Sequence, residues 1–350
     1  MQTLRRARSL LSAVPVHFAR SYTSTMAKAP FLVSPHELSS LVASSSASVK
    51  ILDASWFMPN SPRNAETEFG AKRIPKAQFF DLDKVASPHE LGLKHMMPSN
   101  HQFKEACDKW QIGNDDHVVI YDTQGVFSSP RALFTFRAFN HDRSSILNGG
   151  LPAWEAQNYP VELGPIPEPV QALGESELAT KTYKLPEMDP SVIKDYEQIA
   201  ANCRLDPQTS LSAELVLDAR SKGRWTGADP EPRPSLSSGH MPHSISLPFN
   251  QLVQTHTVPE TGTTYTTLRG PEELKKSFQA ILGDEELEAV LSGQRKLVNS
   301  CGSGMTAAIN WLCLQIIGCN SAIYDESWTG YASRPESIIL KGERSLEERV

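Results

Sequence analysis

Residues 296–314 read KLVNSCGSGMTAAINWLCL, and this order of residue types predicts a strand, a tight loop and a helix. The first five residues have the character of a buried strand. Gly302 and Gly304 allow the positive φ angles that a tight loop requires. The apolar stretch Thr306–Leu314 predicts a helix, which Gly318 is placed to end. A strand that runs directly into a helix is typical of an α/β fold.

The same order of elements occurs earlier in the chain, where a strand at His117–Tyr121 runs through a loop that begins at Asp122 into another apolar helix. Further segments recur in the same order in both halves: Ile51–Ser55 with Val216–Arg220, Arg73–Ala77 with His240–Ser244, Asn100–Trp110 with Pro271–Leu282, and Leu147–Trp154 with Tyr324–Tyr331. This repetition predicts a tandem duplication. We therefore expect an α/β fold of two tandem domains, each a mainly parallel sheet flanked by helices.

The length of 350 residues suits two domains of about 150 residues each. Between the halves, the stretch at 164–190 is rich in Pro, Glu and Ser and lacks strong periodicity, which is typical of a linker. We expect four segments along the chain: a targeting segment at residues 1–30, a first domain at 31–165, a linker at 166–186 and a second domain at 187–345.

The composition excludes several classes of protein. Hydrophobic residues make up 39% of the chain, which is enough for packed cores and excludes a wholly disordered protein. No apolar run approaches the length of about 18 residues that a membrane-spanning helix needs. The formal net charge of −6 argues against direct binding of nucleic acid. The ten histidines show no metal-ligand spacing, and no phosphate loop or dinucleotide fingerprint occurs, so we expect no metal and no tightly bound cofactor.

Residues 1–30 differ in composition from the rest of the chain. They hold five Lys and Arg residues, several Ser and Thr, and no acidic residue, and the first carboxylate is that of Glu37. A segment of this kind is typical of a mitochondrial transit peptide, and a disordered basic tail is the alternative. We therefore expect the protein in the mitochondrial matrix, with Met26 as a second start that would give a cytoplasmic form.

The loop of the second half carries the residue with the most distinctive chemistry, Cys301. It lies between the carboxyl end of a strand and the N-terminus of a helix, where open α/β sheets bind ligands. Backbone N–H groups and the helix dipole at this place favour an anion, here a thiolate. A buried structural cysteine is the alternative, and the strand–Cys–Gly-x-Gly–helix context argues against it. The other cysteines form no Cys-x-x-Cys pair: Cys107, Cys203, Cys313 and Cys319.

The heptapeptide Cys301–Ala307 resembles the Cys-Gly-Ser-Gly-x-Thr-Ala signature of the 3-mercaptopyruvate sulfurtransferases, a family of the rhodanese superfamily. Other segments resemble further motifs of that family: Ser128–Arg131, Phe136–Phe139, Gly223–Gly227, Asp229–Arg233 and Asp325–Trp328. The resemblance covers roughly residues 31–340. It implies two rhodanese-like domains, with an inactive first domain packed against a catalytic second one.

The resemblance also implies an activity. A Cys301 thiolate attacks the sulfur of 3-mercaptopyruvate, pyruvate leaves, and the cysteine becomes a persulfide. An acceptor thiol, such as that of thioredoxin, or cyanide then removes the outer sulfur. Asp122 holds the matching position in the first half and forms no persulfide, which fits an inactive domain. An alternative is a sulfur relay that hands persulfide sulfur to a carrier protein for tRNA thiolation.

Arg224 and Arg233 match the family positions credited with binding the carboxylate of the donor. Surface arginines are the alternative, and a pure relay needs no carboxylate clamp. The hydroxyl of Ser303 would polarise the leaving group or relay its proton, or else satisfy the loop backbone. The other loop residues expected at the substrate are Gly302, Gly304, Met305 and Thr306.

The loop also bears on the choice of donor. Thiosulfate-using rhodaneses carry basic side chains after the cysteine, which suit a dianion. Gly302 and Ser303 are neutral, so the resemblance implies 3-mercaptopyruvate as donor and thiosulfate as a poorer one. A protein tyrosine phosphatase would need an arginine six positions after the cysteine, where this chain has Ala307, and that class is excluded.

Residues outside the loop carry further expectations. Many family members have a histidine implicated in the active site before the first Ile-Pro, where this chain has Arg73. His240 holds the matching place in the second half and is expected to be structural. Trp154 and Trp328 are expected in the core, with Trp328 the better candidate for lining the site. Three histidines in a predicted loop are expected to be solvated: His89, His95 and His101.

Overall fold

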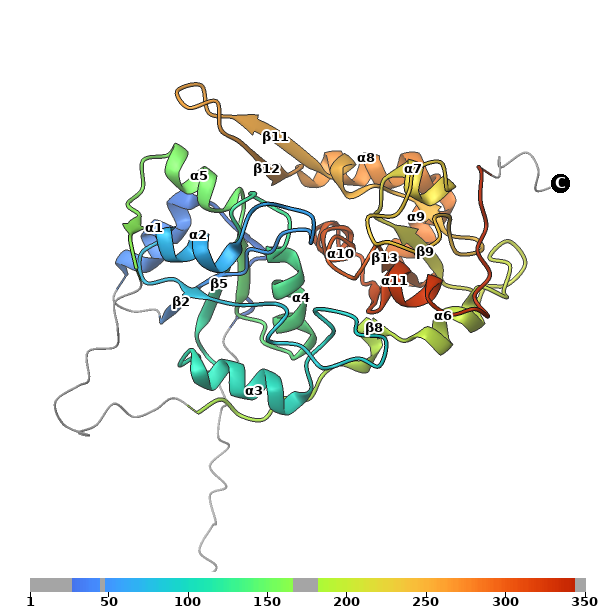
Figure 1. Cartoon of the computed structure of the whole chain (residues 1–350), viewed down its shortest axis with the longest axis horizontal. Coiled ribbons are helices and arrows are strands. Elements are labelled where there is room, and N and C mark those ends of the chain that lie inside the picture. Colours follow the sequence, from blue (N-terminus) through green and yellow to red (C-terminus); the bar gives the residue numbers. More distant parts are fainter. Residues whose placement is uncertain (1–26, 45–47, 166–181, 344–350) are drawn as a thin grey trace, which may run out of the picture.

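The computed structural model describes residues 27–44, 48–165 and 182–343 of the chain. The predicted transit peptide, residues 1–30, falls almost entirely outside this range, so the targeting expectation stays a prediction. Figure 1 shows the described chain as two α/β halves that lie side by side.

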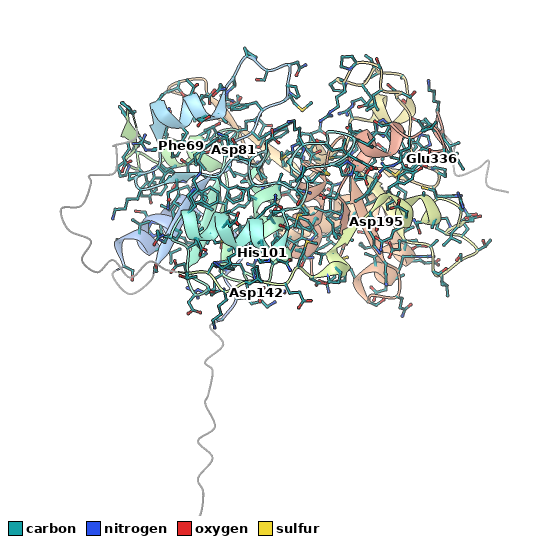
Figure 2. All side chains as sticks on the ribbon, turned by 60° about the horizontal axis from the view of Figure 1, so that its bottom comes forward. Phe69, Asp81, His101, Asp142, Asp195 and Glu336 are labelled. Carbon is teal, nitrogen blue, oxygen red and sulfur yellow. The ribbon has the colours of Figure 1, made fainter. Side chains whose placement is uncertain are left out.

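Side chains fill the space between the two halves (Figure 2). The labelled residues separate accordingly. One half carries Phe69, Asp81, His101 and Asp142, and the other carries Asp195 and Glu336 (Figure 2).

Each half is built on a five-stranded sheet in which all neighbouring strands are parallel. The first sheet has the order β1-β6-β5-β2-β4, with β1 at Leu32–Val33, β2 at Val49–Asp53, β4 at Gln78–Phe79, β5 at His117–Tyr121 and β6 at Ser144–Leu147. The second has the order β8-β14-β13-β9-β10, with β8 at Ile193–Lys194, β9 at Leu215–Asp218, β10 at Ile245–Ser246, β13 at Leu297–Ser300 and β14 at Ala322–Tyr324. The two orders correspond strand for strand. The predicted α/β fold of two tandem domains is therefore confirmed.

The register of the central strands places the two loops of interest at the same edge of each sheet. β5 ends at Tyr121 beside the end of β2, and β13 ends at Ser300 beside the end of β9. Asp122 therefore leaves the first sheet where Cys301 leaves the second. All residues of β5 and β13 are buried, as expected for central strands of a parallel sheet that is covered on both faces.

Helices cover both sheets: α1 at Pro35–Ala43, α2 at Ala65–Ala71, α3 at Asn100–Lys109, α4 at Ser129–Ala138, α5 at Gly150–Ala156, α6 at Tyr196–Asn202, α7 at Lys222–Thr226, α8 at Pro271–Leu282, α9 at Asp284–Leu291, α10 at Ala307–Ile316 and α11 at Ser327–Ala332. Short 3₁₀ turns lie at Pro190–Val192 and Phe249–Gln251, and a small antiparallel pair joins β3, Lys72–Arg73, to β7, Glu162–Leu163. Capping boxes fix the starts of α1, α3 and α6.

The two apolar helices α4 and α10 face each other between the sheets (Figure 1). Every residue at 307–314 is buried, and so is every residue of α4 except Arg137. The rings of Phe134 and Trp311 meet edge to face across this contact, with centroids 5.1 Å apart. Burial on both sides explains why α10 is apolar over most of its surface. α10 ends just before Gly318, whose φ is 84°.

A β-hairpin of the second half reaches back over the first half (Figure 1). It pairs β11, Val253–Thr257, with β12, Thr264–Leu268, in antiparallel fashion, and the sequence analysis did not predict it. The Thr266 N–H donates to the carbonyl of Gln124, in the loop after β5, at 3.3 Å. A Cβ at Gly125 would lie 2.3 Å from the carbonyl oxygen of Thr266, so only glycine allows this approach. The hairpin therefore closes over the loop that begins at Asp122.

The end of the expected linker packs on the first half. Tyr183 is buried, and its ring lies edge to face against Phe103 of α3. Its hydroxyl contacts Nδ1 of His141 at 2.8 Å, and Nε2 of His141 contacts the carbonyl of Asp116 at 3.1 Å. The chain after residue 182 thus belongs structurally to the first core before it enters the second sheet.

Two buried histidines make the stability of the first half dependent on pH. Burial lowers the pKa of His117 and the pKa of His141 to about 4. A histidine in the unfolded chain has a pKa of about 6.5, so between these values the unfolded state binds protons that the folded state does not. The free energy of unfolding therefore falls as the pH falls from about 6.5 to 4, by about 1–2 kcal/mol for each histidine at pH ~5.

Urea unfolding at neutral and mildly acidic pH measures this dependence. We expect the double variant His117→Gln/His141→Gln to lose less stability over the same pH interval than the unaltered chain. An equal loss in both proteins would contradict the assignment to these two side chains.

Candidate active site

The main chain at Cys301 is held by the start of α11. Its N–H donates to the Ser327 hydroxyl at 3.1 Å, and its carbonyl accepts from the Trp328 N–H at 2.9 Å. The carbonyl of Gly302 accepts from the N–H of Thr329 at 2.9 Å and from its hydroxyl at 2.5 Å. Because the C=O and N–H of a trans peptide point in opposite directions, the N–H groups that follow these two carbonyls point away from α11.

The N–H groups of the loop that follows Cys301 are the second feature of the site. Within the described part of the chain, five consecutive N–H groups donate to no other residue: those of Gly302, Ser303, Gly304, Met305 and Thr306. Buried N–H groups normally have a partner, and a run of them before a helix is a ready site for an anion. The loop beside Cys301 is therefore arranged to receive negative charge.

In the first half, the corresponding N–H groups are already occupied. Oδ2 of Asp122 accepts from the N–H groups of Phe127, Ser128 and Ser129 at 2.9, 3.1 and 3.0 Å. It also accepts from the Ser129 hydroxyl at 2.7 Å, and Oδ1 accepts from the Gln124 N–H at 2.9 Å. The same strand–loop–helix unit thus holds a built-in carboxylate in one half and a thiol with free donors in the other.

Cys301 lines a cavity of about 260 Å³ between the two halves. Seven of the eight site residues predicted from the sequence line it: Arg224, Arg233, Cys301, Gly302, Ser303, Met305 and Thr306. The other lining residues are Trp56, Met58 and Phe127 from the first half and Ala219, Arg220, Ser221 and Phe249 from the second. One wall of the cavity is therefore apolar and one is cationic.

The two glycines of the loop serve different contacts. A Cβ at Gly302 would lie 3.1 Å from Nη2 of Arg224 and 3.5 Å from Nη1 of Arg233, so both guanidinium groups lie against the residue after the cysteine. Gly304 does not line the cavity. It has a φ of 82°, and a Cβ there would lie 3.0 Å from Nη1 of Arg131. Gly304 thus allows the approach of the first half rather than of a ligand.

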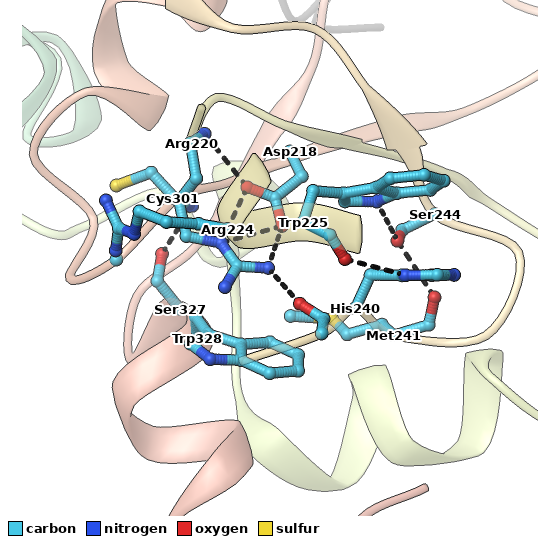
Figure 3. A network of polar contacts seen from close by, with 12 residues as sticks. Asp218, Arg220, Arg224, Trp225, His240, Met241, Ser244, Cys301, Ser327 and Trp328 are labelled. Atoms are coloured by element: carbon cyan, nitrogen blue, oxygen red, sulfur yellow. Dashed lines mark hydrogen bonds and ion pairs between the residues drawn. The ribbon is translucent and has the colours of Figure 1, made fainter. Parts of the chain in front are cut away.

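A buried ion network holds Arg224 in place, and Figure 3 labels three of its members, Asp218, Arg220 and Arg224. Nη2 of Arg224 donates to Oε2 of Glu231 at 2.5 Å, and Nε contacts both Glu231 oxygens at 3.2 Å. Arg220 donates to Oε1 of the same carboxylate at 2.7 Å and to Oδ2 of Asp218 at 2.6 Å. The ring of Trp328 covers the Arg220 guanidinium at 4.1 Å. Arg224 is therefore an ion-paired group with a fixed orientation.

Arg233 is the unpaired cation of the site. Among the described residues, none makes an ion pair or a side-chain hydrogen bond with its guanidinium. Burial lowers the pKa of Arg233, and the nearby sulfur of Cys301 acts in the opposite direction. A guanidinium remains charged at neutral pH even so, so a positive charge without a partner faces Cys301.

The first half contributes groups that the sequence analysis missed. Trp56, Met58 and Phe127 form the apolar wall, and Trp56 lies edge to face against His95 with ring centroids 5.2 Å apart. The prediction that His95 is solvated was wrong, because its side chain is fully buried and its Nδ1 contacts Oδ1 of Asp83 at 2.9 Å. Burial lowers the pKa of His95, and its buried Nε2 has no partner in the described chain.

Four other residues singled out in the sequence have structural positions. Trp154 and Trp328 are buried in core clusters, as predicted, and Trp328 does not line the cavity. His240 stacks on Trp225 at 3.9 Å and contacts its carbonyl, which confirms the structural prediction. Arg73 is buried in the first half, where it pairs with Glu162 and does not reach the cavity.

The four remaining cysteines are free and buried. Burial raises the pKa of each thiol, to about 11 for Cys203 and Cys319 and further for Cys107 and Cys313. Within the described ranges, no group of three or more His, Cys, Asp or Glu side chains is arranged to hold a metal ion. Every helix in those ranges is too short or too polar to cross a membrane.

Comparisons with known proteins agree with this geometry. The family model of the rhodanese-like domain matches residues 34–157. The mitochondrial thiosulfate/3-mercaptopyruvate sulfurtransferase 1 of Arabidopsis thaliana is 37% identical over 85% of this chain and 75% of its own length. The 3-mercaptopyruvate sulfurtransferase of Mus musculus is 36% identical over 85% of this chain and 90% of its own.

A solved structure extends the agreement to three dimensions. The sulfur transferase subunit that is sub-stoichiometric in yeast mitochondrial complex I superposes with a TM-score of 0.73 at 33% identity, covering 90% of this chain and all of that one. The duplicated sheets, the Cys301 loop and these similarities agree. The chain belongs to the tandem rhodanese-domain family of 3-mercaptopyruvate and thiosulfate sulfurtransferases, and it is a sulfurtransferase of the rhodanese superfamily.

Proposed function

We propose that this chain transfers sulfur from 3-mercaptopyruvate, with thiosulfate as a poorer donor, through a persulfide on Cys301 to a thiol acceptor such as thioredoxin, or to cyanide. One observation carries the proposal: a cysteine lies beside five backbone N–H groups without acceptors, while the same loop in the first half is filled by Asp122. That difference supports an anionic sulfur as the natural occupant of the second loop.

The first chemical step forms the persulfide. The Cys301 thiolate attacks the thiol sulfur of the donor, a sulfur–sulfur bond forms, and the carbon–sulfur bond of the donor breaks. The electron pair of that bond stays on carbon, so pyruvate leaves as its enolate and then takes up a proton. The free N–H groups of the loop are placed to stabilise negative charge on sulfur during this exchange.

The second step returns the enzyme to its starting state. An acceptor thiolate attacks the outer sulfur of the persulfide, the sulfur–sulfur bond breaks, and Cys301 leaves as a thiolate. The acceptor gains the sulfur as its own persulfide. The other thiols of the chain are poorly suited to carry the transferred sulfur in place of Cys301. They are buried and their pKa is raised, whereas the thiolate is the reactive form.

The cavity residues receive the remaining roles. Arg233 and Arg224 would hold the carboxylate and the ketone of the donor, and the hydroxyl of Ser303 would polarise the leaving group or relay its proton. Gly302, Met305 and Thr306 would contact the bound donor. The two arginines at the cavity support a small carboxylate donor over a pure relay that feeds a carrier protein for tRNA thiolation. The mitochondrial relatives support a place in the mitochondrial matrix.

Steady-state kinetics with the two donors test the proposal. We expect a higher kcat/KM for 3-mercaptopyruvate than for thiosulfate in the unaltered chain. In Arg233→Ala, kcat/KM with 3-mercaptopyruvate should fall, because the carboxylate of the donor loses its charged partner. The fall should correspond to a loss of about 2–3 kcal/mol of transition-state stabilisation. Arg233→Lys keeps the charge and should lose less. A preference for thiosulfate in the unaltered chain would contradict the assigned donor, and an unchanged Arg233→Ala variant would remove this residue from the binding site.

A further inference from the structure

Four side chains behind the cavity form a linear chain of alternating charges. Asp218 pairs with Arg220, Arg220 pairs with Glu231, and Glu231 pairs with Arg224 at 2.5 Å. The side chains of Asp218, Arg220 and Glu231 are almost fully buried, and that of Arg224 is 19% exposed. The four charges add to zero. The network therefore places the guanidinium of Arg224 at the cavity, while the net charge of the four side chains together is zero.

Arg224 keeps hydrogen-bonding capacity despite this pairing. Glu231 engages its Nε and Nη2 atoms, and Nη1 has no partner among the described side chains. Five N–H donors are available on a guanidinium, so this group can still orient an oxygen of a ligand. Arg224 thus acts toward the cavity as an almost neutral donor.

Among the residues that the structure describes, Arg233 has no such partner and no carboxylate lines the cavity. Of the three arginines that line it, Arg220 and Arg224 are compensated within the network, which leaves the single positive charge of Arg233 facing the donor. One uncompensated cation matches a donor with one carboxylate. It matches a dianion poorly, because the second negative charge would lie in a largely buried cavity without a counter-charge.

We propose that Glu231 is a positioning residue that sets the donor specificity of this enzyme: by cancelling the charge of Arg224, it adapts the cavity to a monoanionic thiol donor and disfavours dianionic thiosulfate. This inference rests on the proposed function, since it concerns the donor of the Cys301 persulfide. The discrimination between a monoanionic thiol donor and thiosulfate then depends on the charge balance behind the cavity as well as on the neutral residues of the loop.

Glu231→Gln tests the inference, because it removes one negative charge with little change in shape. We expect the ratio of kcat/KM for thiosulfate to kcat/KM for 3-mercaptopyruvate to rise about tenfold, since a second cation becomes available to the dianion. Sulfate should become a better competitive inhibitor, while inhibition by pyruvate, a monoanion, should change little. These two inhibitors report on charge in the cavity independently of the chemical step.

Two controls separate charge from a loss of structure. Glu231→Asp keeps the charge but shortens the side chain, so the donor ratio should stay near that of the unaltered enzyme even if stability falls. Glu231→Met also removes the charge, so the donor ratio should rise as in Glu231→Gln, and this variant serves if Glu231→Gln does not fold. Thermal unfolding of each variant confirms that the folded protein is being measured.

An unchanged donor ratio in folded Glu231→Gln would overturn the inference. The same holds if Glu231→Asp shifts the ratio as much as Glu231→Gln, because geometry rather than charge would then be responsible. Either result leaves the Cys301 persulfide and the preference for 3-mercaptopyruvate intact. Conversely, a preference for thiosulfate in the unaltered enzyme would contradict the proposed donor without any reference to Glu231.

Discussion

Replacement of Cys301 by serine is expected to lower turnover with both donors by more than about 1000-fold, because the attacking atom itself is lost. A serine hydroxyl is a far weaker nucleophile toward sulfur, and an oxygen in that position cannot carry the sulfur as a persulfide. The fold should persist, since serine has the same shape and the main-chain bonds of this residue to Ser327 and Trp328 do not involve the sulfur. Release of pyruvate and of sulfite measures the two reactions.

Mass spectrometry of the protein after a single exposure to donor provides the direct readout. The unaltered chain should gain one sulfur atom, and Cys301→Ser should gain none. Cys319→Ser is the matched control, because this buried thiol contacts the carbonyl of Asn320 at 3.4 Å and a hydroxyl can keep that contact. Turnover of Cys301→Ser close to that of the control would rule out the persulfide mechanism.

The Cys301 loop could be predicted from the sequence because all of its determinants are local. The strand that ends at Ser300, the glycine with positive φ and the apolar helix from Ala307 follow one another within a few residues. The bounds of α8, Pro271–Leu282, also match the expectation, since a proline at the first turn and a glycine after the last are local signals. The strand β10 is limited to Ile245–Ser246, because Pro248 has no N–H for the sheet and a 3₁₀ turn follows.

The composition of the cavity depends on how the two halves meet, and a single sequence holds no local signal for that. Trp56 and Phe127 follow strands of the first sheet, but only the packing of the halves brings them to the Cys301 loop of the second. His95 was expected to be solvated because a polar residue in a loop usually is. Instead its side chain is buried within the first half, where its ring meets Trp56, its Nδ1 contacts Asp83 and its carbonyl accepts from Arg131. These partners are distant in the sequence, so the local polarity of the loop gives no signal for the burial.

The hairpin of β11 and β12 was missed although a local signal exists. The two strands are rich in threonine, and Pro259 and Gly262 lie in the connection between them. β-branched residues on both sides of such a turn are typical of a hairpin. The internal repeat gives no signal for this hairpin, because the hairpin has no counterpart among the described residues of the first half.

A buried ion pair between the two halves, Arg131 with Asp325, should have the second largest effect when it is broken. Nη2 of Arg131 donates to Oδ1 of Asp325 at 2.5 Å and to the carbonyl of His95 at 2.8 Å. Arg131 is almost fully buried, and Asp325 also accepts from the Met97 N–H at 2.9 Å. Arg131→Met should lower the free energy of unfolding by about 3–5 kcal/mol, because it leaves a largely buried carboxylate without its cation. Urea unfolding followed by tryptophan fluorescence measures the loss.

A double-variant cycle distinguishes this charge pair from a general loss of packing. Asp325→Met alone should also destabilise the chain, and Arg131→Met/Asp325→Met should recover much of the loss, since no unpaired charge then remains buried. Additive losses would show that the two side chains act independently. Arg137→Met is a control on the same helix, since the hydrogen bonds of that arginine to Asp142, Ala29 and Ser144 stay within the first half. Arg131 also contacts the carbonyl of Gly304 in the Cys301 loop at 3.5 Å. We therefore expect only the variants at Arg131 and Asp325 to weaken sulfur transfer along with stability. Such a link between stability and activity would explain why the half that carries Cys301 retains a neighbouring half that has Asp122 in the matching position.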